Sequence, residues 1–189
     1  HMRKAQLARP NADLAPQRLR VHRLVMLHTP ILETAPRRVW RWGSEADTEA
    51  FARQLAASPA LGDAFIELHG DLGAGKTTFV RHLLRALGIT GRVKSPTYAV
   101  VEPHETPAGL AISHFDFYRF NDPLEWEDAG LRDLFAAPGL KLAEWPEKAA
   151  GLLPVADWVV RIDALDDSAR QVHVAAPTPP GVRLLQAMP

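Results

Sequence analysis

The sequence predicts an α/β fold, and three observations support this prediction. Short apolar runs typical of buried strands occur at residues 64–69, 140–144 and 158–162. After the first run, residues 76–87 place their apolar side chains on one stripe, as an amphipathic helix does. Residues 98–102 and 110–116 favour two strands, and their connection contains proline and glycine, which is typical of a hairpin. Strands and helices in this order predict an α/β domain with an antiparallel hairpin.

Local start and stop signals define the remaining elements. Residues 37–42 form the first predicted strand, and Ser44 is the expected N-cap of the helix that follows it. Asp122, with a proline directly after it, is the expected N-cap of a helix that runs to about Phe135. Residues 171–174 alternate between apolar and polar side chains and are expected to form a late strand.

The chain divides into a leader, a domain and a tail. Residues 1–36 contain several prolines and no sustained hydrophobic period. We therefore expect a flexible basic leader that is in part an artefact, because Met26 is an alternative start. Residues 37–176 form the predicted domain. Residues 177–189 begin with a proline-rich run that is expected to end the ordered body, so they form the predicted C-terminal tail.

The charge is unevenly distributed although the formal net charge of the 189 residues is zero. Residues 1–41 hold nine Lys or Arg and two Asp or Glu, whereas residues 42–189 hold thirteen and twenty. The basic arm is either a contact for nucleic acid or an acidic partner, or an unstructured leader. The chain has no cysteine, which excludes disulfides and Cys-based zinc sites. No apolar run is long enough to span a membrane, and we expect a cytoplasmic location.

A glycine-rich loop follows the strand at residues 64–69. Gly70, Gly75, Lys76 and Thr77 match the pattern G-x-x-x-x-G-K-[ST], which holds the phosphates of a Mg-nucleotide. Backbone N–H groups curled around the phosphates supply many donors, and glycine permits the dihedral angles that this needs. A lysine and two threonines, the second being Thr78, begin the helix, whose positive dipole end faces the phosphates.

Carboxylates and hydroxyls elsewhere in the chain are candidates for the rest of such a site. Asp116 and Glu144 each lie at the end of a predicted strand. In open α/β sheets the carboxyl ends of the strands face the ligand. From position alone, each acid is either a carboxylate beside the metal or a solvated surface residue. Ser95 and Thr97 lie in the loop after the predicted helix at residues 76–87, a place where switch hydroxyls occur. Arg170 is a candidate for neutralising phosphate charge.

Four motifs together resemble one known family. They are Gly-Asp-Leu-Gly-Ala-Gly-Lys-Thr-Thr at 70–78, Val-Lys-Ser-Pro-Thr-Tyr at 93–98, His-Phe-Asp-Phe-Tyr-Arg at 114–119 and Ala-Glu-Trp-Pro-Glu at 143–147. In this order and spacing they resemble the bacterial TsaE (YjeE) family of P-loop ATPases, which acts in tRNA threonylcarbamoyladenosine biosynthesis. The resemblance runs from about Trp40 to about Ala175 and leaves the leader outside.

The resemblance implies a P-loop NTPase-like three-layer sandwich with a mainly parallel central sheet. It implies ATP and Mg²⁺ as cofactors and slow hydrolysis that partners stimulate. It also implies action with the TsaB–TsaD complex, in which TsaD transfers the threonylcarbamoyl group to the adenosine beside the anticodon. Contact with tRNA is expected to be indirect or weak.

The resemblance also assigns roles to residues of this chain. The residues that cradle the phosphates are Asp71, Leu72, Gly73, Ala74, Gly75 and Lys76, with Thr78 beside them. Thr77 and Glu144 are expected to hold Mg²⁺, and Asp116 is the expected catalytic or water-orienting carboxylate. Thr97 belongs to a switch loop on the γ-phosphate side, and Arg170 matches a late arginine near the nucleotide. The expected catalytic residues are therefore Lys76, Asp116 and Glu144.

Three other functions use the same loop. A small-molecule kinase is the main alternative, although no arginine-dense lid segment is visible in the sequence. A GTPase-type switch usually carries an Asn-Lys-x-Asp signature for guanine, and this sequence has none. A nucleotide-dependent binding module without turnover is the third alternative, and variants of Lys76 and Asp116 distinguish it from an ATPase.

Overall fold

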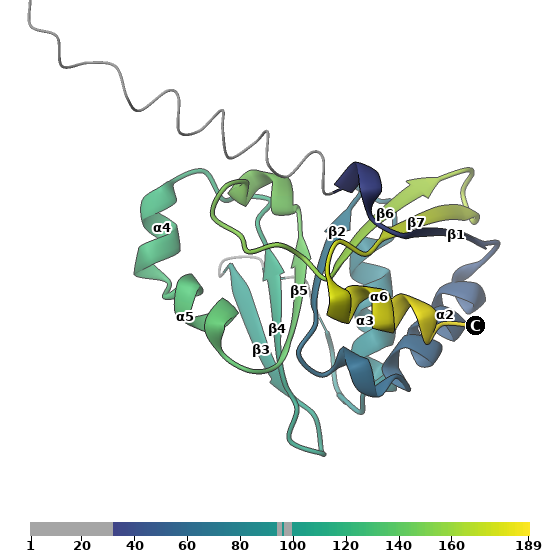
Figure 1. Cartoon of the computed structure of the whole chain (residues 1–189), viewed down its shortest axis with the longest axis horizontal. Helices are drawn as coiled ribbons and strands as arrows, with labels where there is room; N and C mark the ends of the chain where they lie inside the picture. The colour runs from purple at the N-terminus through teal and green to yellow at the C-terminus, as the bar shows by residue number, and fades with distance from the viewer. Residues whose placement is uncertain (1–31, 94–95, 97–99) are drawn as a thin grey trace, which may run out of the picture.

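The structure is a computed structural model that describes residues 32–93, 96 and 100–189 (Figure 1). In this part of the chain, seven strands form one mixed sheet in the order β1-β7-β6-β2-β5-β4-β3. The strands are β1 (Arg37–Trp42), β2 (Phe65–His69), β3 (Val101–Glu105), β4 (Ala111–Asp116), β5 (Leu140–Glu144), β6 (Trp158–Ala164) and β7 (Arg170–Ala175). The central strands β6, β2, β5 and β4 run parallel, and β1, β7 and β3 pair antiparallel with their neighbours. The predicted α/β fold with a parallel centre and an antiparallel β3–β4 hairpin is confirmed.

Helices cover both faces of the sheet and make three layers. The described helices are α2 (Glu45–Ala56), α3 (Lys76–Ala86), α4 (Pro123–Asp128), α5 (Leu131–Ala136) and α6 (Pro179–Gln186), with 3₁₀ turns η1 (Pro59–Leu61) and η2 (Pro146–Ala149). Because successive side chains of a strand point to opposite faces, Ile66 and Leu68 join the core under α2 and α3, whereas Phe65 joins the core under α4 and α5. Figure 1 shows α2 and α3 on one side of the sheet.

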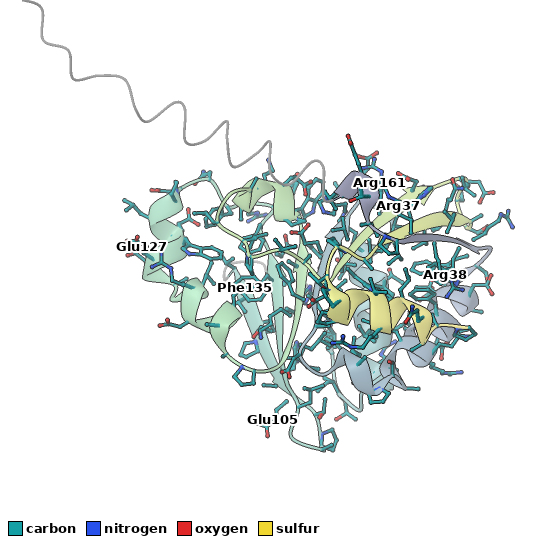
Figure 2. All side chains as sticks on the ribbon, viewed as in Figure 1. Arg37, Arg38, Glu105, Glu127, Phe135 and Arg161 are labelled. Atoms are coloured by element: carbon teal, nitrogen blue, oxygen red, sulfur yellow. The ribbon has the colours of Figure 1, made fainter. Side chains whose placement is uncertain are left out.

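The smaller core is built from aromatic rings. Phe135 of α5, labelled in Figure 2, packs against the rings of Phe65 and Phe115, with centroids 4.9 and 4.5 Å apart. Trp126 of α4 stacks on the same ring at 5.6 Å. These contacts hold the short helices against β2 and β4. Farther along the sheet, on β6, the Arg161 side chain is 59% exposed (Figure 2).

The helix predicted from Asp122 to about Phe135 is wrong in one respect, because it is two helices. Asp122 is the N-cap of α4 as predicted, and its side chain accepts a hydrogen bond from the backbone N–H of Leu124 at 2.9 Å. Gly130 then adopts a left-handed conformation (φ 64°), which ends α4 and begins α5. The hairpin also differs from the prediction, because its first strand extends to Glu105 and so includes Pro103.

Residues 177–189 are not a tail. Thr178 caps α6 by accepting the Gly181 backbone N–H at 3.1 Å, and the prolines at 179 and 180 occupy the first turn of this helix. Proline suits that position because a backbone N–H in the first turn has no partner within the helix, so its absence costs no hydrogen bond. Leu184 is 0% exposed and belongs to the larger core. The run predicted to end the ordered body therefore begins another helix.

None of the described helices is both long and apolar enough to cross a membrane.

Candidate functional site

The glycine-rich loop connects β2 to α3 in a conformation that only glycine adopts easily. Gly70, Gly73 and Gly75 have φ angles of 149°, 80° and 110°. Gly70 also lies close to β6, since a Cβ atom there would be 2.5 Å from the Ile162 carbonyl oxygen. Gly75 is the N-cap of α3, so the first N–H groups of this helix have no partner within the helix. The loop therefore presents a helix N-terminus and backbone donors to one place, as phosphate binding requires.

Lys76 lies inside this loop. Its side chain is almost buried, and its Nζ donates hydrogen bonds to the carbonyl oxygens of Gly70 at 2.5 Å and Asp71 at 2.9 Å. The ammonium also lies 4.3 Å from the centroid of the Trp145 ring, a cation–π contact. Burial lowers the pKa of Lys76, and the negative charge of Glu144 opposes this shift. A buried cation at the base of the loop is placed to meet phosphate charge.

The carboxylate of Glu144 is held from two sides. Its Oε1 accepts the Thr77 hydroxyl at 2.7 Å, and its Oε2 lies 2.5 Å from Nε2 of His114. Glu144 is 2% exposed. Burial raises its pKa, but the hydrogen bond and charge of His114, the hydrogen bond of Thr77 and the charge of Lys76 together bring the pKa below its ordinary value. Glu144 is therefore an ionised carboxylate at neutral pH although it is buried.

Asp116 lies beside Glu144 on the neighbouring strand of the sheet. The two residues are partners in the parallel register of β4 and β5, at the carboxyl ends of both strands. Its Oδ1 accepts the backbone N–H of Tyr118 at 2.9 Å, which fixes the carboxylate at the start of the following turn. The two strand-end acids that the sequence suggested are thus neighbours at the loop side of the sheet, where open α/β sheets bind ligands.

Arg170 reaches the loop from the start of β7. Its Nε donates to the Ala74 carbonyl at 2.7 Å, and its Nη1 donates to the Asp166 carbonyl at 2.9 Å. These contacts tie the loop backbone to the β6–β7 turn. Leu72, at the tip of the loop, is 77% exposed, and Thr78 is partly buried in the first turn of α3. Ser95 and Thr97, the predicted switch hydroxyls, lie outside the described residues.

His114 is the site residue that the motif analysis did not single out. It lies on β4 two residues before Asp116 and is 0% exposed. The signal for it is the alternation of β4, because Ile112, His114 and Asp116 share one face and Ile112 belongs to the core under α3. A histidine in that row points toward α3 and the loop. Its contact with Glu144 depends also on the pairing of β4 with β5, which is not visible in the sequence.

The arrangement fits a magnesium ion held together with a nucleotide. Within the described residues, no three His, Cys, Asp or Glu side chains are grouped as a metal cage. Mg²⁺ seldom uses such a cage, since one or two protein oxygens hold it and substrate phosphates and waters complete its octahedron. Thr77 Oγ1 and Glu144 Oε1, 2.7 Å apart beside the loop, supply oxygens of this kind.

Comparisons with known proteins agree with this geometry. The family model described as "Threonylcarbamoyl adenosine biosynthesis protein TsaE" matches residues 42–172, which include the loop, both acids and Arg170. The chain belongs to the TsaE family. The TsaE protein of Haemophilus influenzae is 48% identical over 122 residues, which cover 65% of this chain and 76% of that protein. TsaE of Bacillus subtilis is 36% identical over 137 residues, 72% of this chain and 84% of that protein.

A solved structure gives the same result for the fold. The crystal structure of Bacillus subtilis YdiB superposes with a TM-score of 0.66 at 29% identity, and the match covers 81% of this chain and 94% of that one. As a TsaE family member, the chain has a place in tRNA threonylcarbamoyladenosine biosynthesis. The predicted family is confirmed.

Proposed function

We propose that this protein binds ATP with Mg²⁺, hydrolyses it slowly alone, and acts as the accessory ATPase of the TsaB–TsaD complex in tRNA threonylcarbamoyladenosine modification. The observation that carries the ATPase proposal is the pair formed by Thr77 and Glu144 beside a phosphate-type loop. An ionised carboxylate next to the loop threonine supports a metal–phosphate site rather than an ordinary glycine-rich turn. Cytoplasmic action follows from these partners.

Each residue of the site has a separate role in this proposal. The loop N–H groups and Lys76 bind the β- and γ-phosphates, and Lys76 leaves the carbonyls of Gly70 and Asp71 to do so. Thr77 and Glu144 hold Mg²⁺, which neutralises charge on the phosphates when it is bound. Asp116, beside Glu144, orients the attacking water and accepts its proton.

ATP binding is tested with a lysine pair. Lys76→Ala removes the buried ammonium, and Lys148→Ala, at an exposed position of the 3₁₀ turn η2, is the matched control. We expect K76A to lose ATP affinity by at least about tenfold, since a charge-assisted contact contributes roughly 1.5–3 kcal/mol, and K148A to bind as wild type does. Isothermal titration with ATP and Mg²⁺ measures both. Equal affinities for K76A and wild type would exclude the phosphate loop as the binding site.

Hydrolysis is tested with an aspartate pair. Asp116→Asn keeps a carbonyl oxygen for the Tyr118 N–H but cannot take a proton, and Asp128→Asn, exposed on α4, is the control. We expect D116N to bind ATP normally and to lose phosphate release by about 10²–10⁴-fold, the usual contribution of a general base. Full turnover in D116N would remove Asp116 from the mechanism.

The partnership is tested separately from the ATPase. Phosphate release by wild type is measured with and without purified TsaB, TsaD and tRNA. We expect turnover to rise in the complete mixture and D116N to remain inactive in it. If the rate is the same in every mixture, the protein is an ATPase without this partnership.

A further inference from the structure

His114 is a fully buried polar side chain whose single described hydrogen bond reaches the site. Its Nε2 lies 2.5 Å from Oε2 of Glu144, and both side chains are inaccessible, at 0% and 2% exposure. Its other ring nitrogen, Nδ1, has no hydrogen-bond partner among the described residues. Burying an imidazole costs free energy unless its polar atoms are satisfied. The contact with Glu144 is the described interaction that offsets this cost.

The strand geometry gives His114 its direction. Its Cα faces Leu142 of β5, while Asp116 faces Glu144, so the histidine lies one pleat behind the two acids on the same face. From there the ring meets Oε2 of the Glu144 carboxylate. Thr77, on α3, meets the other oxygen at 2.7 Å.

The two contacts together determine how the carboxylate is oriented. Two oxygens bonded to groups on different elements, β4 and α3, prevent rotation about the last side-chain bond of Glu144. The Phe117 N–H also donates to the Glu144 carbonyl at 3.0 Å, which fixes the backbone of the same residue. The oxygen bonded to Thr77 therefore stays on the loop side of the sheet, and the oxygen bonded to His114 stays inside the core.

We propose that His114 is a positioning residue that holds the Glu144 carboxylate toward Thr77, so that Mg²⁺ meets two preoriented protein oxygens. The proposal rests on the function proposed above, because it concerns the same metal. His114 donates its Nε2–H to Oε2 and leaves Oε1 for the ion and the threonine. It touches neither the nucleotide nor the metal. Partners that orient a metal ligand commonly change metal affinity when they are removed.

The test is the Mg²⁺ dependence of ATP binding in matched variants. His114→Leu removes the donor, whereas His114→Gln places an amide N–H near the position of Nε2. Ile112→Ala, two residues earlier on the same buried face, is the control for general loosening of β4. Each protein is titrated with MgCl₂ at a fixed concentration of a fluorescent ATP analogue, and its affinity for the analogue is measured separately in EDTA.

We expect the Mg²⁺ concentration at half-saturation to rise by roughly 10- to 100-fold in H114L, with unchanged binding in EDTA. H114Q should recover most of this loss, and I112A should keep the wild-type midpoint. Thermal unfolding identifies a variant that does not fold. If H114L fails to fold, His114→Asn replaces it, because its amide is too short to reach Glu144.

Three results would overturn the inference. They are a wild-type midpoint in H114L or H114N, an equal rise in H114Q, and an equal rise in I112A. In each of these the wild type still shows Mg²⁺-dependent binding, so the proposed function survives. A wild type without Mg²⁺-dependent binding refutes the proposed function and this inference with it.

Discussion

Replacing Glu144 by glutamine is predicted to destabilise the protein even without nucleotide. The substitution keeps the shape of the side chain and removes its charge. Wild-type Glu144 accepts hydrogen bonds from Thr77 and His114 in a buried site. Burial raises its pKa, but these hydrogen bonds and the charges of His114 and Lys76 bring the pKa below the ordinary value of 4.5. The ionised form is therefore the one that the fold stabilises.

The magnitude follows from the two hydrogen bonds. A hydrogen bond to a charged group contributes about 1.5–3 kcal/mol and a neutral one about 0.5–1.5 kcal/mol. A glutamine retains one good acceptor, for the Thr77 hydroxyl, and points an N–H or a second lone pair at His114. We expect E144Q to lose about 1–3 kcal/mol of the free energy of unfolding at pH 7.

The assay is urea unfolding in EDTA, followed by circular dichroism at pH 7 and at lower pH. A lowered pKa in the folded state stabilises the protein above pH 4.5, and this contribution is lost as the pH falls through the folded-state pKa. The difference between wild type and E144Q should therefore be full at pH 7 and shrink below pH 4.5. If E144Q is as stable as wild type at pH 7, or the difference grows on acidification, then the carboxylate is not held as an ion.

Three further changes test other parts of the structure. Arg170→Lys cannot reproduce the guanidinium hydrogen bond to the Ala74 carbonyl, so ATP affinity should fall by about fivefold, or roughly 1 kcal/mol, in calorimetric titration. An unchanged affinity would show that this hydrogen bond to the loop is not needed for ATP binding. Leu184→Ala in α6 should lower the free energy of unfolding by about 2–5 kcal/mol, whereas Leu124→Ala on the surface should cost under about 0.5 kcal/mol; equal values would mean that α6 is not part of the core. Burial lowers the pKa of His104 from 6.5, so wild-type stability should decline as the pH drops below 6.5 and His104→Gln should remove that part of the decline in urea titrations; parallel pH profiles would contradict this.

Local signals were enough to predict most elements of this fold. Strand β2, the loop and α3 follow one another within a short segment, and each is marked by its own residues. The errors occurred where one residue type has two uses. The predicted helix includes Gly130, which instead ends α4, because a left-handed residue has no periodic signature. The prolines before Gly181 predict an end to the ordered body but begin α6, since proline also suits the first helical turn.

The site residues were predictable where a local pattern in the sequence marks them. Lys76 and Thr77 belong to one motif, and Asp116 and Glu144 each end a strand, so the sequence indicates all four as candidates. It does not indicate that the two acids are register partners, because that depends on β4 pairing with β5 rather than with β2. The role of Arg170 as a brace on the loop depends likewise on where the β6–β7 turn lies.

His114 shows what the fold adds to the motifs. The sequence alone places it in a strand next to an acid, where a satisfied core histidine is an ordinary finding. The parallel pairing of β4 with β5 brings its ring to one oxygen of the Glu144 carboxylate, and Thr77 of α3 donates to the other oxygen. One strand, its neighbour and the helix after the loop thus each contribute one group to a single line of hydrogen bonds. Because the line joins three elements distant in sequence, a substitution of the histidine, which lies 30 residues before Glu144 in the chain, should weaken metal binding at the carboxylate.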